Sequence, residues 1–142
     1  VTSEVLSFDV ENMSGGWTAL PSMSTPRRYH ACDTGNYEGL YGIFVTGGSG
    51  GLDEQPFYPS VEFYVAQEQR WRVLRSMTTA RAYHSLSIVS GLPYAAGGYF
   101  PHTASVERLN GTNWEEAGRM WVLRMEHAAV NIPAGVLNCR MG

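Results

Sequence analysis

The histidines are the residues in this sequence best suited to bind a metal ion, because neutral imidazole is a common metal ligand. Three of the four, His30, His84 and His127, follow one another at intervals of 54 and 43 residues. A metal site needs ligands that converge on one point. These three histidines occupy the same place in an internal repeat of the sequence, described below, so each is expected in a different structural unit. We therefore give these three histidines a structural role, place His102 at a loop tip, and expect no metal and no cofactor.

The sequence shows no recognisable catalytic motif. The sequence contains no nucleophile elbow, phosphate-binding loop or carboxylate pair in a recognisable motif. The glycine-rich run at 47–51 precedes no predicted helix, so its backbone amides are not placed to bind a phosphate group. We expect no catalytic residue and predict that the chain is not an enzyme.

The elements that must position these side chains come from an internal repeat. A tryptophan is followed six residues later by a methionine, then four residues later by an arginine, then three residues later by a histidine. This pattern occurs three times without an offset, and because Trp and Met are rare residue types, chance does not explain it. Its members are Trp17, Met23, Arg27 and His30; Trp71, Met77, Arg81 and His84; and Trp114, Met120, Arg124 and His127.

Two further pieces recur between these blocks. Gly47-Gly48 and Gly97-Gly98 each end an apolar run, and a Ser-Val-Glu triplet follows each of them, at 60–62 and 105–107. Glycine at the end of a strand allows positive φ and the close approach of another backbone. The arginines of the pattern are predicted to bind backbone carbonyls or the glutamates of the two triplets, Glu62 and Glu107.

The double glycine, the later Val-Glu strand and the tryptophan strand together resemble the kelch family, over nearly the whole chain. The resemblance implies an all-β fold of kelch-type β-propeller blades, each with four antiparallel strands. The implied division is the end of a blade at 1–28, complete blades at 29–76 and 77–120, and the start of a blade at 121–142. A propeller needs about four to eight blades to close, so one chain is expected to form an incomplete ring.

The resemblance also places the strands within each blade. Short β-branched and aromatic segments support these positions, and no stretch has sustained helical periodicity. The expected innermost strands are 29–33, 83–89 and 127–132; the second strands are 41–46, 93–96 and 136–141; the third strands are 4–9, 60–65 and 104–109; and the outer strands begin at Trp17, Trp71 and Trp114.

An incomplete ring would leave open strand edges, which invite further pairing. Two interpretations follow, and the first is favoured. The chain is a fragment of a longer propeller, or the opening strands of one copy complete the last blade of another, so that a homodimer closes a six-blade ring.

Propellers bind their ligands through loops, because the blades are sealed against one another. The function that the resemblance implies is a protein–protein interaction scaffold; the alternative is a carbohydrate-binding or galactose-oxidase-like extracellular propeller. Kelch contacts commonly come from loops that correspond here to 49–59 with 99–103, and 21–28 with 75–82. Exposed aromatic and acidic side chains make the first pair the preferred candidate: Leu52, Asp53, Glu54, Phe57, Tyr58, Tyr99, Phe100 and His102.

Composition and short motifs limit the partners and the compartment. A net charge of −3 gives no reason to expect nucleic acid, and no apolar run is long enough to span a membrane. Two glycosylation sequons begin at Asn12 and Asn110, and they slightly favour the extracellular compartment without deciding it. Cys32 and Cys139 fall on different strands two repeats apart, so we predict no disulfide between them, while pairing with a cysteine outside the chain stays open.

Overall fold

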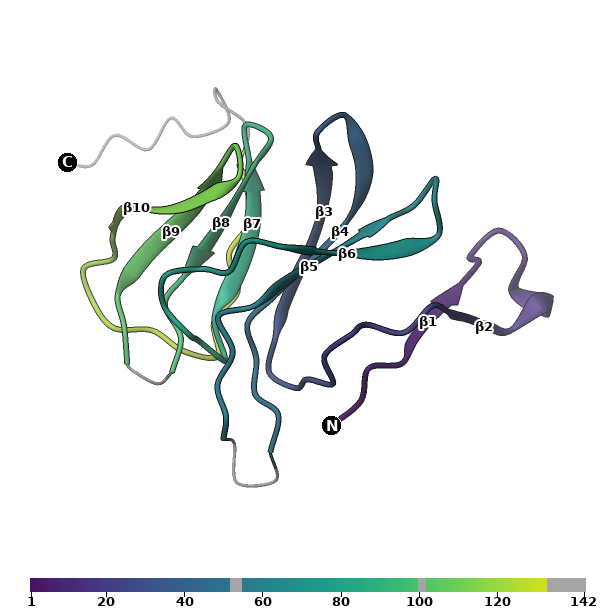
Figure 1. Cartoon of the computed structure of the whole chain (residues 1–142), viewed down its shortest axis with the longest axis horizontal. Helices are drawn as coiled ribbons and strands as arrows, with labels where there is room; N and C mark the ends of the chain where they lie inside the picture. Colours follow the sequence, from purple (N-terminus) through teal and green to yellow (C-terminus); the bar gives the residue numbers. More distant parts are fainter. Residues whose placement is uncertain (52–54, 100–101, 133–142) are drawn as a thin grey trace.

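The structure, a computed structural model, describes residues 1–51, 55–99 and 102–132, and these fold as antiparallel β-sheets (Figure 1). The hairpin of β1 (Val5–Phe8) and β2 (Trp17–Leu20) carries one 3₁₀ turn, η1 (Met13–Gly15), in its loop. The first four-stranded sheet contains β3 (Ala31–Tyr37), β4 (Leu40–Thr46), β5 (Val61–Val65) and β6 (Arg70–Leu74); the second contains β7 (Ser85–Val89), β8 (Leu92–Ala96), β9 (Ser105–Asn110) and β10 (Asn113–Arg119). The prediction of an all-β chain is confirmed, and among the described residues no helix is long and apolar enough to cross a membrane.

Each strand of a four-stranded sheet pairs with the strand that follows it in the sequence. Short turns join β3 to β4 and β7 to β8 at one end, which we call the turn end. The longer connections at 47–60 and 97–104 lie at the opposite end, together with the segments that lead into β3 and β7. This loop end is at the bottom of both sheets in Figure 1.

The two turns of the turn end have the backbone conformation that suits the right-handed twist of paired strands. Glu38 and Gly39 have φ values of 51° and 81°, and Ser90 and Gly91 have φ values of 50° and 81°. Glycine takes such values without strain because it has no Cβ. Two matching turns therefore set the register of the inner strand pair in both sheets.

The two four-stranded sheets share one apolar core. Phe44 and Phe63 of the first sheet are fully buried with ring centroids 4.5 Å apart, and Trp114 of the second sheet belongs to the same cluster. Burial of a large apolar side chain stabilises the fold by about 1.5–3 kcal/mol. The innermost strands, β3 and β7, approach closely at Gly35, which has no side chain. A Cβ at this position would lie only 3.1 Å from the side chain of Ile88.

The double glycines lie where the backbone of the next repeat crosses them. A Cβ on Gly47 would lie 2.3 Å from the carbonyl oxygen of Arg81, and a Cβ on Gly97 would lie 2.5 Å from that of Arg124. Both glycines also have positive φ, 61° and 65°. Any side chain at these positions would therefore separate one repeat from the next.

A buried ion pair ties the loop end of each four-stranded sheet together. Arg27 donates to the carboxylate of Glu62 at 2.8 Å and to the carbonyl of Gly47 at 2.6 Å, and both charged side chains are almost fully buried. In the second sheet, Arg81 donates to Glu107 at 2.6 Å and to the matching glycine carbonyl at 2.8 Å. The predicted binding of these two arginines to carbonyls and glutamates is confirmed.

The same glutamates also hold the backbone that precedes each arginine. The amide and hydroxyl groups of Ser24 donate to Glu62 at 2.7 and 2.8 Å, and those of Thr78 donate to Glu107 at 2.7 and 2.6 Å. Burial alone would raise the pKa of Glu62, but these hydrogen bonds and the charge of Arg27 lower it overall. Both carboxylates are therefore held in the charged form inside the fold.

The strands lie close to their expected positions, with one exception. The predicted innermost strand at 127–132 is wrong, because these residues form no strand. A strand is stabilised by its ladder partners, and this segment has none among the described residues. The second strand expected at 136–141 lies outside the described residues, and β3 is longer than expected, since it continues to Tyr37.

We predict that Arg81→Met lowers the free energy of unfolding by about 3–5 kcal/mol, because the buried charge of Glu107 loses its main partner. Urea denaturation measures this change. The double variant Arg81→Met/Glu107→Gln should lose less than the sum of the two single variants. Arg72→Met, which breaks an exposed pair with Glu68, should leave the urea midpoint almost unchanged; equal losses in Arg81→Met and Arg72→Met would contradict the prediction.

Candidate partner-binding surface

Aromatic side chains from successive repeats meet at the loop end. The rings of Tyr29 and Tyr83 stack with centroids 4.1 Å apart. Tyr99 contacts Tyr83, Phe57 and His102 at centroid distances of 6.4, 5.9 and 4.7 Å. We call these five residues the aromatic cluster; all of them are at least partly accessible to solvent.

A backbone ladder places the two tyrosines of the stack. Tyr29 and Tyr83 both have a φ of 56°, and Glu126 at the matching position of the third repeat has a φ of 53°. The amide of Tyr83 donates to the carbonyl of Tyr29 at 2.9 Å, and the amide of Glu126 donates to that of Tyr83 at 2.8 Å. Successive repeats therefore present equivalent side chains side by side, and the third repeat presents a carboxylate.

Short antiparallel bridges attach the neighbouring loops to the ladder. Arg28 and Ser49 exchange two backbone hydrogen bonds, and Ala82 and Tyr99 do the same in the next repeat. The guanidinium of Arg28 lies over the ring of Tyr29, 5.0 Å from its centroid. The cluster thus combines aromatic faces with one positive charge at its edge.

A hollow of about 300 Å³ opens beside the cluster, lined by Tyr83, Tyr99, His102, Met125 and Glu126. Its lining mixes aromatic rings, a thioether and a carboxylate.

Four of the eight residues that the sequence indicated for partner binding are described by the structure. Phe57, Tyr99 and His102 belong to the aromatic cluster, whereas Tyr58 lies against Gly50 and 5.8 Å from the guanidinium of Arg27. The other four, Leu52, Asp53, Glu54 and Phe100, lie outside the described residues.

Sequence reasoning missed Tyr29, Tyr83, Met125 and Glu126 as members of this surface. Tyr29 and Tyr83 directly follow the candidate loops 21–28 and 75–82, whereas Met125 and Glu126 follow none of the candidate loops; all four residues stand between the arginine and the histidine of the repeated pattern. That fixed spacing was the available signal, but it carries no information on positive φ. Positive φ at Tyr29 and Tyr83 turns these side chains toward the loop end instead of into the strand.

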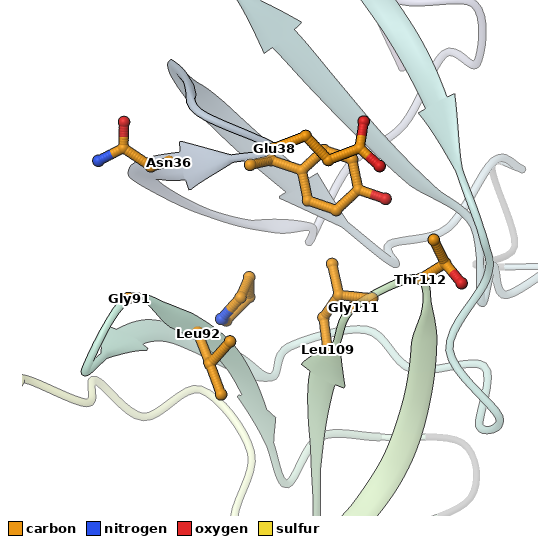
Figure 2. A pocket seen from close by; sticks show the side chains of 9 residues that line it. Asn36, Glu38, Gly91, Leu92, Leu109, Gly111 and Thr112 are labelled. Atoms are coloured by element: carbon orange, nitrogen blue, oxygen red, sulfur yellow. The ribbon is translucent and has the colours of Figure 1, made fainter.

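Figure 2 shows a second hollow, of about 190 Å³, at the turn end between the two four-stranded sheets. The turn residue Glu38 lies on one side of it, and Leu92, Leu109 and Thr112 lie on the other. Glu38 is the only carboxylate in its lining, so no pair of acid and base groups is present.

The repeated histidines lie between repeats. A ring nitrogen of His84 lies 2.8 Å from the hydroxyl of Thr46, and one of His127 lies 3.0 Å from the hydroxyl of Ser85. Burial lowers the pKa of His84 to about 3, helped by the charges of Arg81, His30 and His127. Within the described ranges, no three His, Cys, Asp or Glu side chains are grouped to hold a metal.

The pKa values of the other two repeated histidines are also lowered. Burial is the main cause for both, and the charge of Arg27 adds to it for His30, as that of Arg124 does for His127. Protonation of any of the three is therefore opposed by the fold.

The sequons and the cysteines occupy different parts of the fold. Asn12 precedes the 3₁₀ turn of the hairpin and Asn110 ends β9, and both are exposed, as an acceptor of a glycan must be. The thiol of Cys32 is free, and burial together with the charge of Asp33 raises its pKa. Cys139 lies outside the described residues.

Comparison of the sequence with models of known protein families found no match, and comparison with curated proteins found no relative.

We predict that acid destabilises the chain through His84. The unfolded chain binds a proton on this histidine near pH 6.5, whereas the folded chain does so only near pH 3. The stabilisation is therefore complete above pH 6.5 and is lost as the pH falls, by up to about 1.4 kcal/mol per pH unit. Urea denaturation between pH 6.5 and 4.5 should show this slope reduced in His84→Gln relative to the wild type.

His102→Gln is the matched control, because it removes an exposed histidine and should keep the slope of the wild type. The prediction fails if His84→Gln and His102→Gln show the same dependence of stability on pH.

Proposed function

We propose that this chain is part of a kelch-type β-propeller and acts as a scaffold that binds a protein partner through its loop end. Two sheets of four sequential antiparallel strands, each with the same buried arginine–glutamate pair, support the blade interpretation. The observation that carries the binding proposal is the aromatic cluster, whose rings come from four different loops of two successive repeats.

The cluster has the composition of an interface centre. Tyrosine is enriched among the residues that contribute most binding energy, since it offers a large contact area with few rotatable bonds for its size. In the described residues the cluster already contains stacked and edge-to-face ring pairs, so little side-chain entropy remains to be lost on binding.

The test is site-specific photo-crosslinking in an extract of the cells that produce the protein. A photoreactive residue at position 57 or 99 should capture one protein of defined mass, whereas the same residue at the turn-end position 41 should not. Tyr41 is the matched control, since it is half-exposed and lies far from the cluster, at the start of β4.

With the captured protein purified, Tyr29→Ala and Tyr99→Ala should each weaken its binding at least about tenfold, the effect expected of interface hot spots. Tyr41→Ala should leave the affinity unchanged. The loop end would be ruled out as the binding surface if a photoreactive residue at position 41 captured the same protein as one at position 57 or 99. Equal affinities of the Tyr29, Tyr99 and Tyr41 variants would rule it out as well.

A further inference from the structure

The chain contains one carboxylate-binding arrangement twice in filled form. In the first repeat, the backbone amides of Ser24 and Thr25 donate to Glu62 at 2.7 and 3.2 Å, and the guanidinium of Arg27 completes the site. The second repeat uses Thr78, Thr79 and Arg81 around Glu107 with almost the same distances. Each arginine reaches one more group, the hydroxyl of Ser60 at 3.2 Å or of Ser105 at 3.0 Å.

The segment 120–124 has the spacing of this arrangement, with Arg124 at the arginine position, and no carboxylate of the described residues pairs with it. The backbone of Arg124 is held as in the other repeats, since its carbonyl accepts from the amide of Gly98 at 2.7 Å. Its side chain is exposed and makes no ion pair or hydrogen bond within the part of the chain that the structure describes. Trp121 occupies the position of Ser24 and Thr78, and it is fully exposed.

The hairpin of β1 and β2 corresponds to the pair of strands that carries the glutamate in each sheet. Phe8 stands opposite Trp17 in the same register as Tyr64 opposite Trp71. Glu62 lies two residues before Tyr64, so its counterpart in the hairpin is Leu6. Counted in the same way, the counterpart of Ser60 is Glu4. A second alignment agrees, because the carbonyls of Ser3, Pro59 and Ala104 all accept from the methionine amide that begins the next loop.

The hairpin and the segment 120–124 depart from the repeated pattern in complementary ways. Leu6 stands where a glutamate is expected and is 56% exposed, while Trp121 stands where a hydroxyl residue is expected. The hairpin has its carboxylate at Glu4 instead. This is the position of Ser60 and Ser105, whose hydroxyls accept from the arginine in the first and second repeats. An exposed apolar pair and an exposed opposite-charge pair would therefore meet if the hairpin of one copy docked beside the segment 120–124 of another as β5 and β6 lie beside 23–27.

The hairpin also has an uncovered edge and an uncovered face. Among the described residues β1 pairs only with β2, so one edge of β1 offers unpaired backbone groups. A groove of about 290 Å³ lies between the hairpin and the first sheet, and its lining includes Val5, Leu6, Ile43, Val45 and Trp71. The corresponding space between the two four-stranded sheets is filled with apolar core.

We infer that a second copy of this chain covers these surfaces, with the β1–β2 hairpin of each copy docked beside the segment 120–124 of the other. Glu4 of one copy then pairs with Arg124 of its partner, and Leu6 packs against Trp121. A two-fold axis makes both contacts twice, so neither hairpin is left open. This dimer follows from the repeated contacts inside the chain and is independent of the partner proposed for the loop end.

Charge reversal tests the pairing through the mass of the full chain in solution, measured by light scattering after size exclusion over a wide range of concentration. The wild type should be a dimer of about 31 kDa, twice the 15.7 kDa of the chain. Glu4→Arg and Arg124→Glu should each raise the dimer dissociation constant about a hundredfold or more, since both contacts become like-charge pairs that cost at least tenfold each.

An equal mixture of the two variants should dimerise again, because the mixed dimer contains one Arg–Glu pair of each orientation and no like-charge pair. Far-UV circular dichroism of the single variants checks that they remain folded. The controls Glu11→Arg and Arg75→Glu make the same charge changes at other exposed positions, and they should dimerise like the wild type.

A monomeric wild type would overturn the inference. So would open-ended assembly, or a mixture of the two variants that dimerises no better than either variant alone. Trp121→Ser should weaken the dimer as well, and an unchanged dissociation constant in that variant would exclude the apolar contact with Leu6.

Discussion

The buried pairing of an arginine with a glutamate is the interaction on which the loop end depends. A charge inside the fold costs several kcal/mol unless it is paired and hydrogen-bonded, and in each repeat the terminal nitrogens of the arginine have the same set of partners. Arg27 and Glu62 join the segment that enters β3 to the connection between β4 and β5. The loops of each repeat are therefore fixed to the sheet they belong to.

The contacts between repeats rest on a second constraint, the absence of a side chain at the double glycines. The backbone of one repeat passes over the glycines of the repeat before it at the pattern's arginine, Arg81 or Arg124. The histidine three residues after that arginine, His84 or His127, lies beside the same glycines. The tyrosine before His84 is turned outward by its positive φ. One local geometry thus produces both the tight packing between sheets and the row of aromatic side chains that we propose as a binding surface.

The hairpin and the segment 124–127 are held by local contacts. The hairpin forms because β1 and β2 are close in sequence and pair with one another, whereas the segment 124–127 contacts Gly98, Tyr83 and Ser85 of the second repeat. The side chains exposed at these two places differ from the repeated pattern in matching ways. This agrees with the inferred docking of a second copy and gives it a chemical basis beyond unpaired strand edges.

The sequence by itself determined the all-β architecture, the approximate strand positions and the pairing of Arg27 and Arg81 with glutamates, because turn residues, alternation and a fixed spacing are local signals that recur. Only the tertiary structure decided that 127–132 is not a strand, that Tyr58 turns inward, and that Tyr29 and Tyr83 belong to the aromatic cluster. The physical reason is that register and ring contacts depend on which strands lie opposite one another, and residues far apart in sequence set that alignment.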